Sequence, residues 1–146
     1  MREIEFRGKV LEDDNFFGYK KGQWVFGNYS KDRLYNNIHI EDTSKEDIES
    51  IDVDPDTVGQ YTGLTDKNGT KMFEGDIVKF IYRNKKMTGN IIWEYGRFAI
   101  YNTGVGYSIT NLVLNGNDSI ELLGNIHDNP ELLEGTWKEF FLENRS

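Results

Sequence analysis

The chain has 146 residues, no cysteine and a net charge of -8 at neutral pH. The lack of cysteine excludes disulfides, thiolate metal sites and cysteine nucleophiles, and the negative charge argues against nonspecific affinity for nucleic acid or anionic lipid. The N-terminus lacks the apolar segment of a signal peptide, and no run approaches the roughly 18 apolar residues that span a bilayer. We therefore expect a cytoplasmic protein that does not enter the membrane.

The first 40 residues predict three strands, because their apolar residues alternate with polar ones. The segments are 2–11 (REIEFRGKVL), 22–30 (GQWVFGNYS) and 33–41 (RLYNNIHIE). We assign residues 1–58 to an N-terminal β region that ends in an acidic linker.

The linker at residues 41–56 carries eight acids against Lys45 alone. The acids are Glu41, Asp42, Glu46, Asp47, Glu49, Asp52, Asp54 and Asp56. We expect an acidic loop with a turn of helix at 44–47. The alternative is an acidic patch that copies the phosphate spacing of DNA and occupies a host DNA-binding protein.

Asp52, Asp54 and Asp56 have the spacing of the first calcium ligands of an EF-hand. The glycine and glutamate that complete that loop are replaced by Thr57 and Gly63, so an acidic turn is the better interpretation. The two histidines lie far apart in the sequence and form no cluster. We therefore expect no metal, no cofactor and no catalytic residues.

From residue 59 onward, short alternating segments predict an antiparallel β structure. We place strands near 59–64, 71–73, 76–83, 87–94, 97–102, 107–114 and 119–126, with turns at Asn68-Gly69, Gly89-Asn90, Gly104 to Gly106 and Asn115-Gly116. Short strands at this spacing are typical of a small barrel, which removes reactive sheet edges. The predicted fold is mainly β: a small antiparallel barrel, SH3-like or related, over residues 59–146, preceded by the N-terminal β region.

The glycine-rich stretch before residue 80 is interpreted as structural turns. The turn residues are Gly63, Asn68, Gly69, Glu74, Gly75 and Asp76, with Gly75 permitting a sharp bend and Asp76 accepting backbone hydrogen bonds. The alternative is that Glu74 and Asp76 act as an acid and a base, but the sequence gives no environment that would separate their pKa values.

One hairpin gathers basic residues around an aromatic. Lys79, Tyr82, Arg83, Lys85 and Lys86 are candidates for contact with single-stranded nucleic acid through stacking and phosphate contacts. The alternative is a solvated hairpin tip.

At the C-terminus the apolar period changes from strand to helix. Asp128, Pro130 and Glu131 predict a capped helix start, and Thr136 with Glu139 repeats the pattern. The second helix would expose a stripe formed by Trp137, Phe140 and Phe141. We expect this stripe to cover the protein's own barrel or to form an interface with a sister subunit.

Several motifs together resemble one protein family. They are FRGKV, GQWVFG, VDPDTVGQ, TVGQYTGLTDKNGTKMFEGDIVKF and IELLGNIHDNPELLEG, spread over roughly residues 1–135. In this order they are similar to the YopX family of phage and prophage proteins from Gram-positive bacteria, although His127 stands where we expect tyrosine in relatives. The resemblance implies a barrel-like phage protein of the bacterial cytoplasm and implies no activity.

The aromatic content favours binding over catalysis. With 20 aromatic residues, we expect some of the tyrosines to face solvent, namely Tyr29, Tyr35, Tyr61, Tyr95, Tyr101 and Tyr107. The leading hypothesis is a non-enzymatic accessory protein that binds itself or a host or phage protein. The DNA mimic and the single-strand binder are the alternatives, and an enzyme is the least favoured class.

Overall fold

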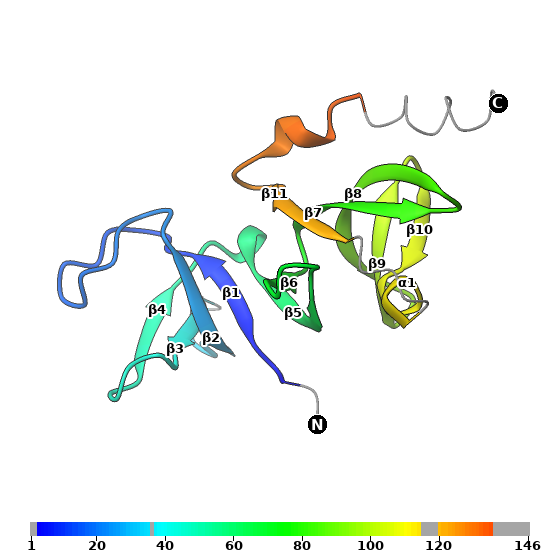
Figure 1. Cartoon of the computed structure of the whole chain (residues 1–146). Coiled ribbons are helices and arrows are strands. Elements are labelled where there is room, and N and C mark those ends of the chain that lie inside the picture. Colours follow the sequence, from blue (N-terminus) through cyan, green and yellow to red (C-terminus); the bar gives the residue numbers. More distant parts are fainter. Residues whose placement is uncertain (1–2, 36, 115–119, 136–146) are drawn as a thin grey trace. The chain divides into compact units, whose positions relative to one another are not determined.

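The computed structural model describes residues 3–35, 37–114 and 120–135, and it is mainly β (Figure 1). The chain divides into two compact units, Met1–Tyr61 and Thr62–Ser146. The sequence places this division three residues earlier, after residue 58. Among the described residues, no helix has the length and apolarity needed to cross a membrane.

The N-terminal unit is built on antiparallel strands. They are β1 (Phe6–Lys9), β2 (Trp24–Lys31), β3 (Ile38–Asp42) and β4 (Glu49–Asp52). β5 (Gly59–Thr65) runs from this unit into the next and is followed by β6 (Lys71–Phe73), and the strand order of the sheet is β4-β3-β2-β1-β5-β6. The strands expected in the first 40 residues are present.

The core of the N-terminal unit follows from strand alternation. Val25, Ile40 and Ile51 are fully buried, and β-pairing sets Ile40 opposite Ile51. An isolated bridge between Val10 and Val53 joins the end of β1 to the end of β4. These residues, together with Tyr19, form one apolar cluster.

The acidic segment 41–56 is not a linker. Its first residues end β3, residues 43–48 form a hairpin loop without a helical turn, and β4 follows. Pro55–Thr57 forms a short 3-10 helix, η1, whose first amide is capped by the Asp54 carboxylate. The prediction failed because buried Ile51 and Val53 alternate with the acids and give this segment a core-facing side.

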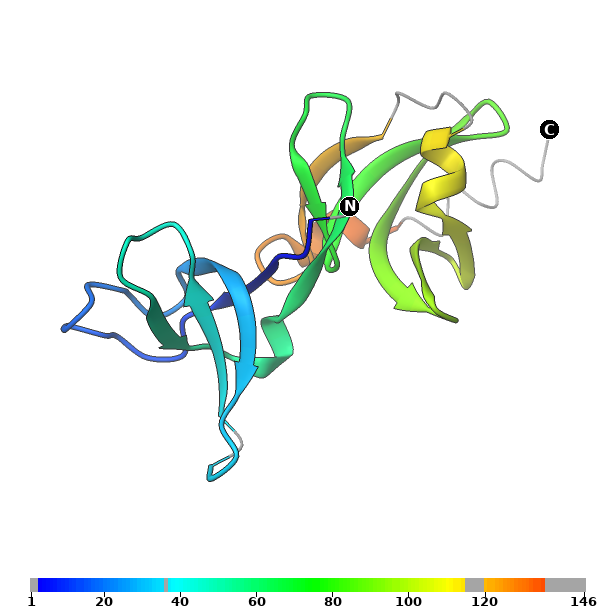
Figure 2. The same cartoon turned by 90° about the horizontal axis from the view of Figure 1, so that it is seen from below.

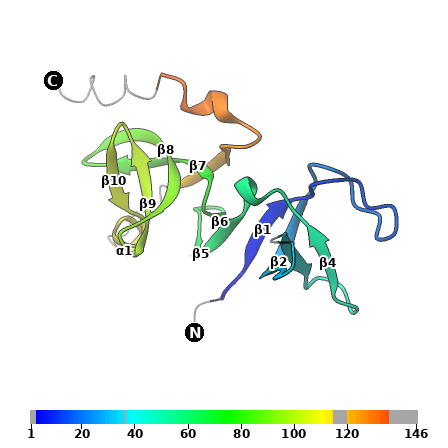
Figure 3. The same ribbon diagram turned by 180° about the vertical axis from the view of Figure 1, so that it is seen from behind.

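The second unit contains a five-stranded antiparallel sheet (Figure 3). Its strands are β7 (Asp76–Tyr82), β8 (Lys85–Glu94), β9 (Arg97–Asn102), β10 (Val105–Ser108) and β11 (Glu121–Asn125), in the order β10-β9-β8-β7-β11. β10 and β11 are the two edges, and no pairing joins them among the described residues. The antiparallel β class is confirmed, whereas closure into a barrel is not seen.

Three tight hairpins connect the strands of this sheet. Each connection has two residues with positive φ, namely Arg83-Asn84, Tyr95-Gly96 and Thr103-Gly104. Paired positive φ values match the right-handed twist of the flanking strands. The first of these turns lies in the hairpin predicted around Lys79 to Lys86, and the last overlaps the turn predicted at Gly104 to Gly106.

The predicted turn at Gly89-Asn90 is wrong, and the predicted turn at Asn68-Gly69 is present but belongs to a longer loop. Gly89-Asn90 lies inside β8, where a Cβ on Gly89 would stand 2.4 Å from the Tyr101 carbonyl oxygen. That glycine serves the close approach of β9 rather than a turn. Asn68-Gly69 is not a two-residue hairpin, because only Gly69 has positive φ and the loop spans residues 66–70.

The segment 107–114 is half strand and half helix. β10 ends at Ser108, and α1 (Ile109–Leu114) follows, packed beside β9 and β10 (Figure 2). Ile109 is buried, and Leu112 and Val113 pack against the same core. Their i, i+3, i+4 spacing is helical, but β-branched residues in a short apolar run imitate a strand.

At the C-terminal end of the described residues, Pro130–Leu133 forms the 3-10 helix η2. The expected reciprocal cap is absent there, because Asn129 is the cap residue and the Asp128 carboxylate accepts from the Asn125 side chain. The predicted stripe of Trp137, Phe140 and Phe141, the second cap at Thr136 and Glu139, and the turn at Asn115-Gly116 lie outside the described residues.

One carboxylate fixes the β5–β6 loop. Asp66 is 7% exposed, and it accepts hydrogen bonds from the amides of Asn68, Thr70 and Leu122. Burial alone would raise the pKa of Asp66, but these amides and the Lys67 charge outweigh burial and lower it. Because Leu122 belongs to β11, Asp66 ties two segments together that are 56 residues apart.

Replacing Asp66 should therefore destabilise the second unit. We expect Asp66→Ala to lower the free energy of unfolding by about 3 kcal/mol, because buried amides lose their acceptor. Urea denaturation measures this change. The control, Asp47→Ala in the exposed β3–β4 loop, should stay within about 0.5 kcal/mol of wild type. Equal effects of the two variants would contradict the assigned role.

Candidate functional site

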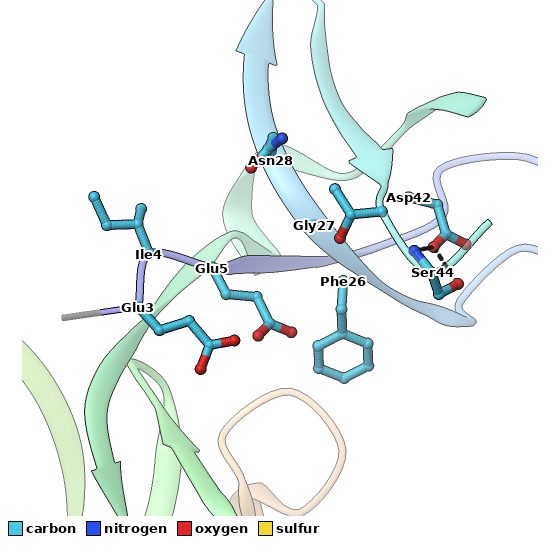
Figure 4. A pocket seen from close by; sticks show the side chains of 9 residues that line it. Glu3, Ile4, Glu5, Phe26, Gly27, Asn28, Asp42 and Ser44 are labelled. Atoms are coloured by element: carbon cyan, nitrogen blue, oxygen red, sulfur yellow. Dashed lines mark hydrogen bonds between the residues drawn. The ribbon is translucent and has the colours of Figure 1, made fainter. Parts of the chain in front are cut away.

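The N-terminal unit contains a hollow of about 240 Å³, which we call the N-terminal hollow (Figure 4). Three segments line it: the residues before β1, the middle of β2, and the end of β3 with the loop that follows. The lining residues are Glu3, Ile4, Glu5, Phe26, Gly27, Asn28, Asp42, Thr43 and Ser44.

Gly27 makes this arrangement possible. It is paired with Phe6 on one side and with Asp42 on the other. A Cβ at Gly27 would stand 1.7 Å from the Glu41 carbonyl oxygen, so no other residue allows β3 to approach this closely. The glycine thereby lets the end of β3 lie close to β2, where Asp42 lines the hollow.

The wall combines negative charge with an aromatic ring. Figure 4 shows the Glu3 and Glu5 side chains on the same side of the chain as the Phe26 ring. Phe26 is 42% exposed although it lies in the middle of a strand, and Asp42 adds a third carboxylate at the other end. An anionic wall beside a ring suits a cation whose apolar stem lies on the ring.

Asp42 is held rigidly by hydrogen bonds. It is buried, and it accepts from the Ser44 amide at 2.9 Å, the Ser44 hydroxyl at 2.5 Å and the Tyr19 hydroxyl at 2.5 Å. Burial would raise its pKa, but the hydrogen bonds from Ser44 and Tyr19, aided by the Lys45 charge, lower it. Asp42 is therefore a fixed negative charge.

The Tyr19 hydroxyl lies between two carboxylates. It also donates a hydrogen bond to Glu49 Oε2 at 3.0 Å, and the same oxygen accepts a hydrogen bond from Lys45 Nζ at 2.8 Å. Burial, followed by the bonds to the carboxylates, raises the pKa of Tyr19 to about 12. The bond to Glu49 is the main cause that raises the pKa of Lys45, whose ammonium lies 4.5 Å from the centre of the Tyr19 ring.

The acidic patch predicted at 41–56 is only partly a free surface. Asp42 and Glu49 bind Tyr19, Asp52 pairs with His39, and Asp54 caps η1. Glu46, Asp47 and Asp56 are exposed, and Glu41 is half-buried. Four of the eight carboxylates thus hold the fold together.

The basic hairpin divides over two faces. Pairing of Ile81 with Lys86 and of Lys79 with Thr88 puts Lys79 and Lys86 on one face, whereas Tyr82 and Lys85 share the other. The Tyr82 ring packs on Tyr107 at 4.3 Å and borders the core. Arg83 lies in the turn, 5.2 Å from the centre of that ring.

Four of the six predicted turn residues lie in two connections between strands, whereas Gly63 and Asp76 belong to strands. Gly63 (φ 85°) lies in β5, and Asn68 and Gly69 lie in the β5–β6 loop. Glu74 and Gly75 connect β6 to β7, with φ 95° at Gly75. Asp76 is buried and its carboxylate accepts the Phe73 amide at 2.7 Å, which is a structural rather than a catalytic contact.

His39 contacts a carboxylate, as the histidine of a catalytic triad does, but it is not hydrogen-bonded to the serine opposite it. Its Nδ1 lies 2.5 Å from Asp52 Oδ1, and Ser30 is paired opposite it on β2. No hydrogen bond joins Ser30 to His39, and the N-terminal hollow does not include His39. Within the described part of the chain, no group of three His, Cys, Asp or Glu residues is placed to hold a metal ion.

Sequence reasoning missed the N-terminal hollow. The signal was available at Gly27, since an isolated glycine inside a strand pattern indicates a close backbone approach. Tyr19 carried no such signal, because its partners are 23 and 30 residues away. Of the tyrosines expected at the surface, Tyr61 is buried and Tyr107 packs on Phe80.

Two of three comparisons relate the chain to known proteins. A family model described as YopX protein matches residues 5–134. A solved structure, the crystal structure of protein EF1440 from Enterococcus faecalis, is 26% identical, with a TM-score of 0.51, and the match covers 92% of this chain and 100% of that one. A search of curated proteins found no match.

Adding a side chain at Gly27 should disrupt the N-terminal unit. We expect Gly27→Ala to lower the free energy of unfolding by about 3 kcal/mol, because the new Cβ overlaps the backbone of β3. The control is Gly18→Asn, at a position with φ 81° and no atom within 4 Å of an added Cβ. Because asparagine tolerates this conformation, its change should stay below about 1 kcal/mol in urea denaturation. An unchanged Gly27→Ala variant would refute the close approach.

The stabilisation from the Tyr19 hydroxyl should depend on pH. Tyr19→Phe should be less stable than wild type by about 1–2 kcal/mol at neutral pH. The pKa of Tyr19 is raised to about 12 in the folded state, so this advantage is full below the unfolded value of about 10 and is lost as pH rises through the folded pKa. Denaturation of both proteins along a pH series measures the difference.

The control for this series is Tyr95→Phe, because the Tyr95 side chain is 96% exposed. Its stability should follow that of wild type throughout. If the difference in unfolding free energy between Tyr19→Phe and wild type stayed constant up to pH values near 12, the hydroxyl would not be held as described.

Proposed function

We propose that this chain, which belongs to the YopX family, is a non-enzymatic binding module that seats a basic side chain of a protein partner in the N-terminal hollow. The observation that carries the proposal is the wall of that hollow. Glu3, Glu5 and Asp42 line a volume of about 240 Å³ that the partly exposed Phe26 also lines.

The size and chemistry of the hollow favour an arginine or lysine side chain. The methylene groups of such a side chain can lie along the Phe26 ring while the cationic end reaches a carboxylate. Aromatic residues are enriched at the centres of protein interfaces, where they supply most of the apolar contact. The fixed charge of Asp42 needs no rearrangement on binding, which limits the entropy lost.

The nucleic-acid alternatives have less support. A DNA mimic needs a continuous row of free carboxylates, and four of the predicted eight are bound within the fold. A single-strand site needs an aromatic platform beside the phosphate contacts, and Tyr82 is packed on Tyr107 away from Lys79 and Lys86. A protein partner is therefore the better hypothesis.

We further propose that the protein acts in the cytoplasm of a bacterium that carries a phage or prophage. The family match and the similarity to an Enterococcus faecalis protein support a bacterial setting. For the second unit we propose a small barrel that is SH3-like or related: tight hairpins and a short helix before the last strand support it, although no pairing closes the sheet between β10 and β11 in the described part of the chain.

The partner can be trapped at the hollow. Asn28 is exposed and lines the wall, so a photoreactive benzoylphenylalanine in its place should cross-link the bound protein in phage-carrying cells. The control carries the same group at Thr110, which is exposed on α1. We expect one cross-linked protein with the Asn28 probe and none of it with the Thr110 probe.

Two further substitutions test the chemistry of the wall. Phe26→Ala and Glu5→Lys should each reduce the yield of the cross-linked protein at least tenfold, which corresponds to about 1.4 kcal/mol. Tyr95→Ala, at an exposed turn of the second unit, should leave the yield unchanged. A product that forms equally well with all three variants would refute the proposal, as would the absence of any product.

A further inference from the structure

The β1–β2 loop presents a phenylalanine to solvent from an ordered frame. Phe16 is 88% exposed. The amides of Phe16 and Phe17 both bind the Asp14 carboxylate at 3.0 Å, and Asp14 and Tyr19 form a β-bridge at the base of the tip. Figures 1 and 3 show this loop extending beyond the strands of its unit. The backbone that carries this ring is therefore ordered, which reduces the entropy lost when the ring contacts a partner.

A second hollow lies beside this ring. It has a volume of about 470 Å³ and is lined by Leu11, Glu12, Asp13, Asp14, Asn15, Phe16, Ser50, Ile51 and Asp52. All of its charged residues are acidic. We call this region the Phe16 surface, and its chemistry fits an apolar contact surrounded by cations.

The second unit offers the complementary chemistry. On one face of the β7–β8 hairpin, Lys79 and Lys86 are exposed and Ile81, paired with Lys86, is partly exposed between them. Arg83 is exposed in the adjacent turn, in which Arg83 and Asn84 both have positive φ. The acid across from Lys79 on β11 is Glu121, which pairs with Lys67 at 3.0 Å. This basic face therefore surrounds an apolar residue with positive charge.

We propose that the Phe16 surface of one molecule binds the basic face of the β7–β8 hairpin of a second copy. Phe16 lies on Ile81 and on the methylene groups of Lys79 and Lys86, whose ammonium groups reach Glu12 and Asp13. The two surfaces differ, so the contact is heterologous, and a pair of copies keeps one free surface of each kind. The interaction therefore builds open chains or a ring.

The overall charge of -8 opposes association, but only at long range. At physiological ionic strength the Debye length is about 8 Å, so the repulsion between whole molecules is screened while contacting charges still attract. Association should therefore be strongest at intermediate salt, because low salt restores the repulsion and high salt weakens the contact pairs.

Charge reversal tests the heterologous contact. One variant, Glu12→Lys with Asn15→Lys and Asp52→Lys, changes the net charge of the residues that line the Phe16 surface from -4 to +1 and keeps Asp13 and Asp14, which hold the loop. The other variant, Lys79→Glu with Lys86→Glu, makes the hairpin acidic. Each variant alone should sediment as a monomer at concentrations where wild type associates, and an equimolar mixture of the two should associate again.

Analytical ultracentrifugation of the full chain, over about a hundred-fold concentration range, measures these states. Phe16→Ala should weaken wild-type association at least tenfold, and circular dichroism of each variant checks that it is folded. Phe26→Ala, which alters the N-terminal hollow, should associate like wild type, so this result is independent of the proposed partner binding. A wild type that stays monomeric at every concentration, or a mixture that does not associate, would overturn the inference.

Discussion

The hydrogen bond from the Tyr19 hydroxyl to the buried Asp42 carboxylate organises the N-terminal unit. Tyr19 forms the base of the Phe16 loop through its bridge to Asp14, and its ring belongs to the core. Asp42 ends β3 and lines the N-terminal hollow. One buried polar contact thus positions both surfaces that we assign to binding, and such contacts are strong because each partner would otherwise be buried without a hydrogen bond.

The strands were largely predictable because their determinant is local. Alternation in segments such as 76–82 and 97–102 fixes which side chains face the core, and the structure has strands there. The predictions failed where the local sequence is compatible with two structures. Residues 109–114 fit a strand or a helix, and a glycine such as Gly89 fits a turn or a close backbone approach. In each case a neighbouring strand decides the outcome, and the sequence does not say which strand that will be.

The candidate site was predictable only in part, for a related reason. The acids at 41–56 have the composition of a solvated loop, and the sequence cannot distinguish Asp42, which binds Tyr19, from Asp47, which faces solvent. The N-terminal hollow combines segments near residues 4, 27 and 43, so no contiguous motif encodes it. Likewise, the basic hairpin has the expected residues, but strand pairing puts Tyr82 and Lys79 on opposite faces. Composition predicted the kinds of residue at each surface, and pairing determined which of them act together.

The exposed rings argue for binding because of where they are held. Each unit buries its own small apolar cluster, and neither cluster includes Phe16 or Phe26. An exposed aromatic on a flexible segment would lose conformational entropy on contact. The backbone at Phe16 is already fixed by hydrogen bonds from the Phe16 and Phe17 amides to Asp14, and the backbone at Phe26 by its place in β2. Acids stand beside both rings, at Glu5 and Asp42 in one case and at Glu12 and Asp52 in the other. A ring bordered by carboxylates favours cationic contacts over anionic ones, and this preference is the physical basis of the basic protein partners that we propose.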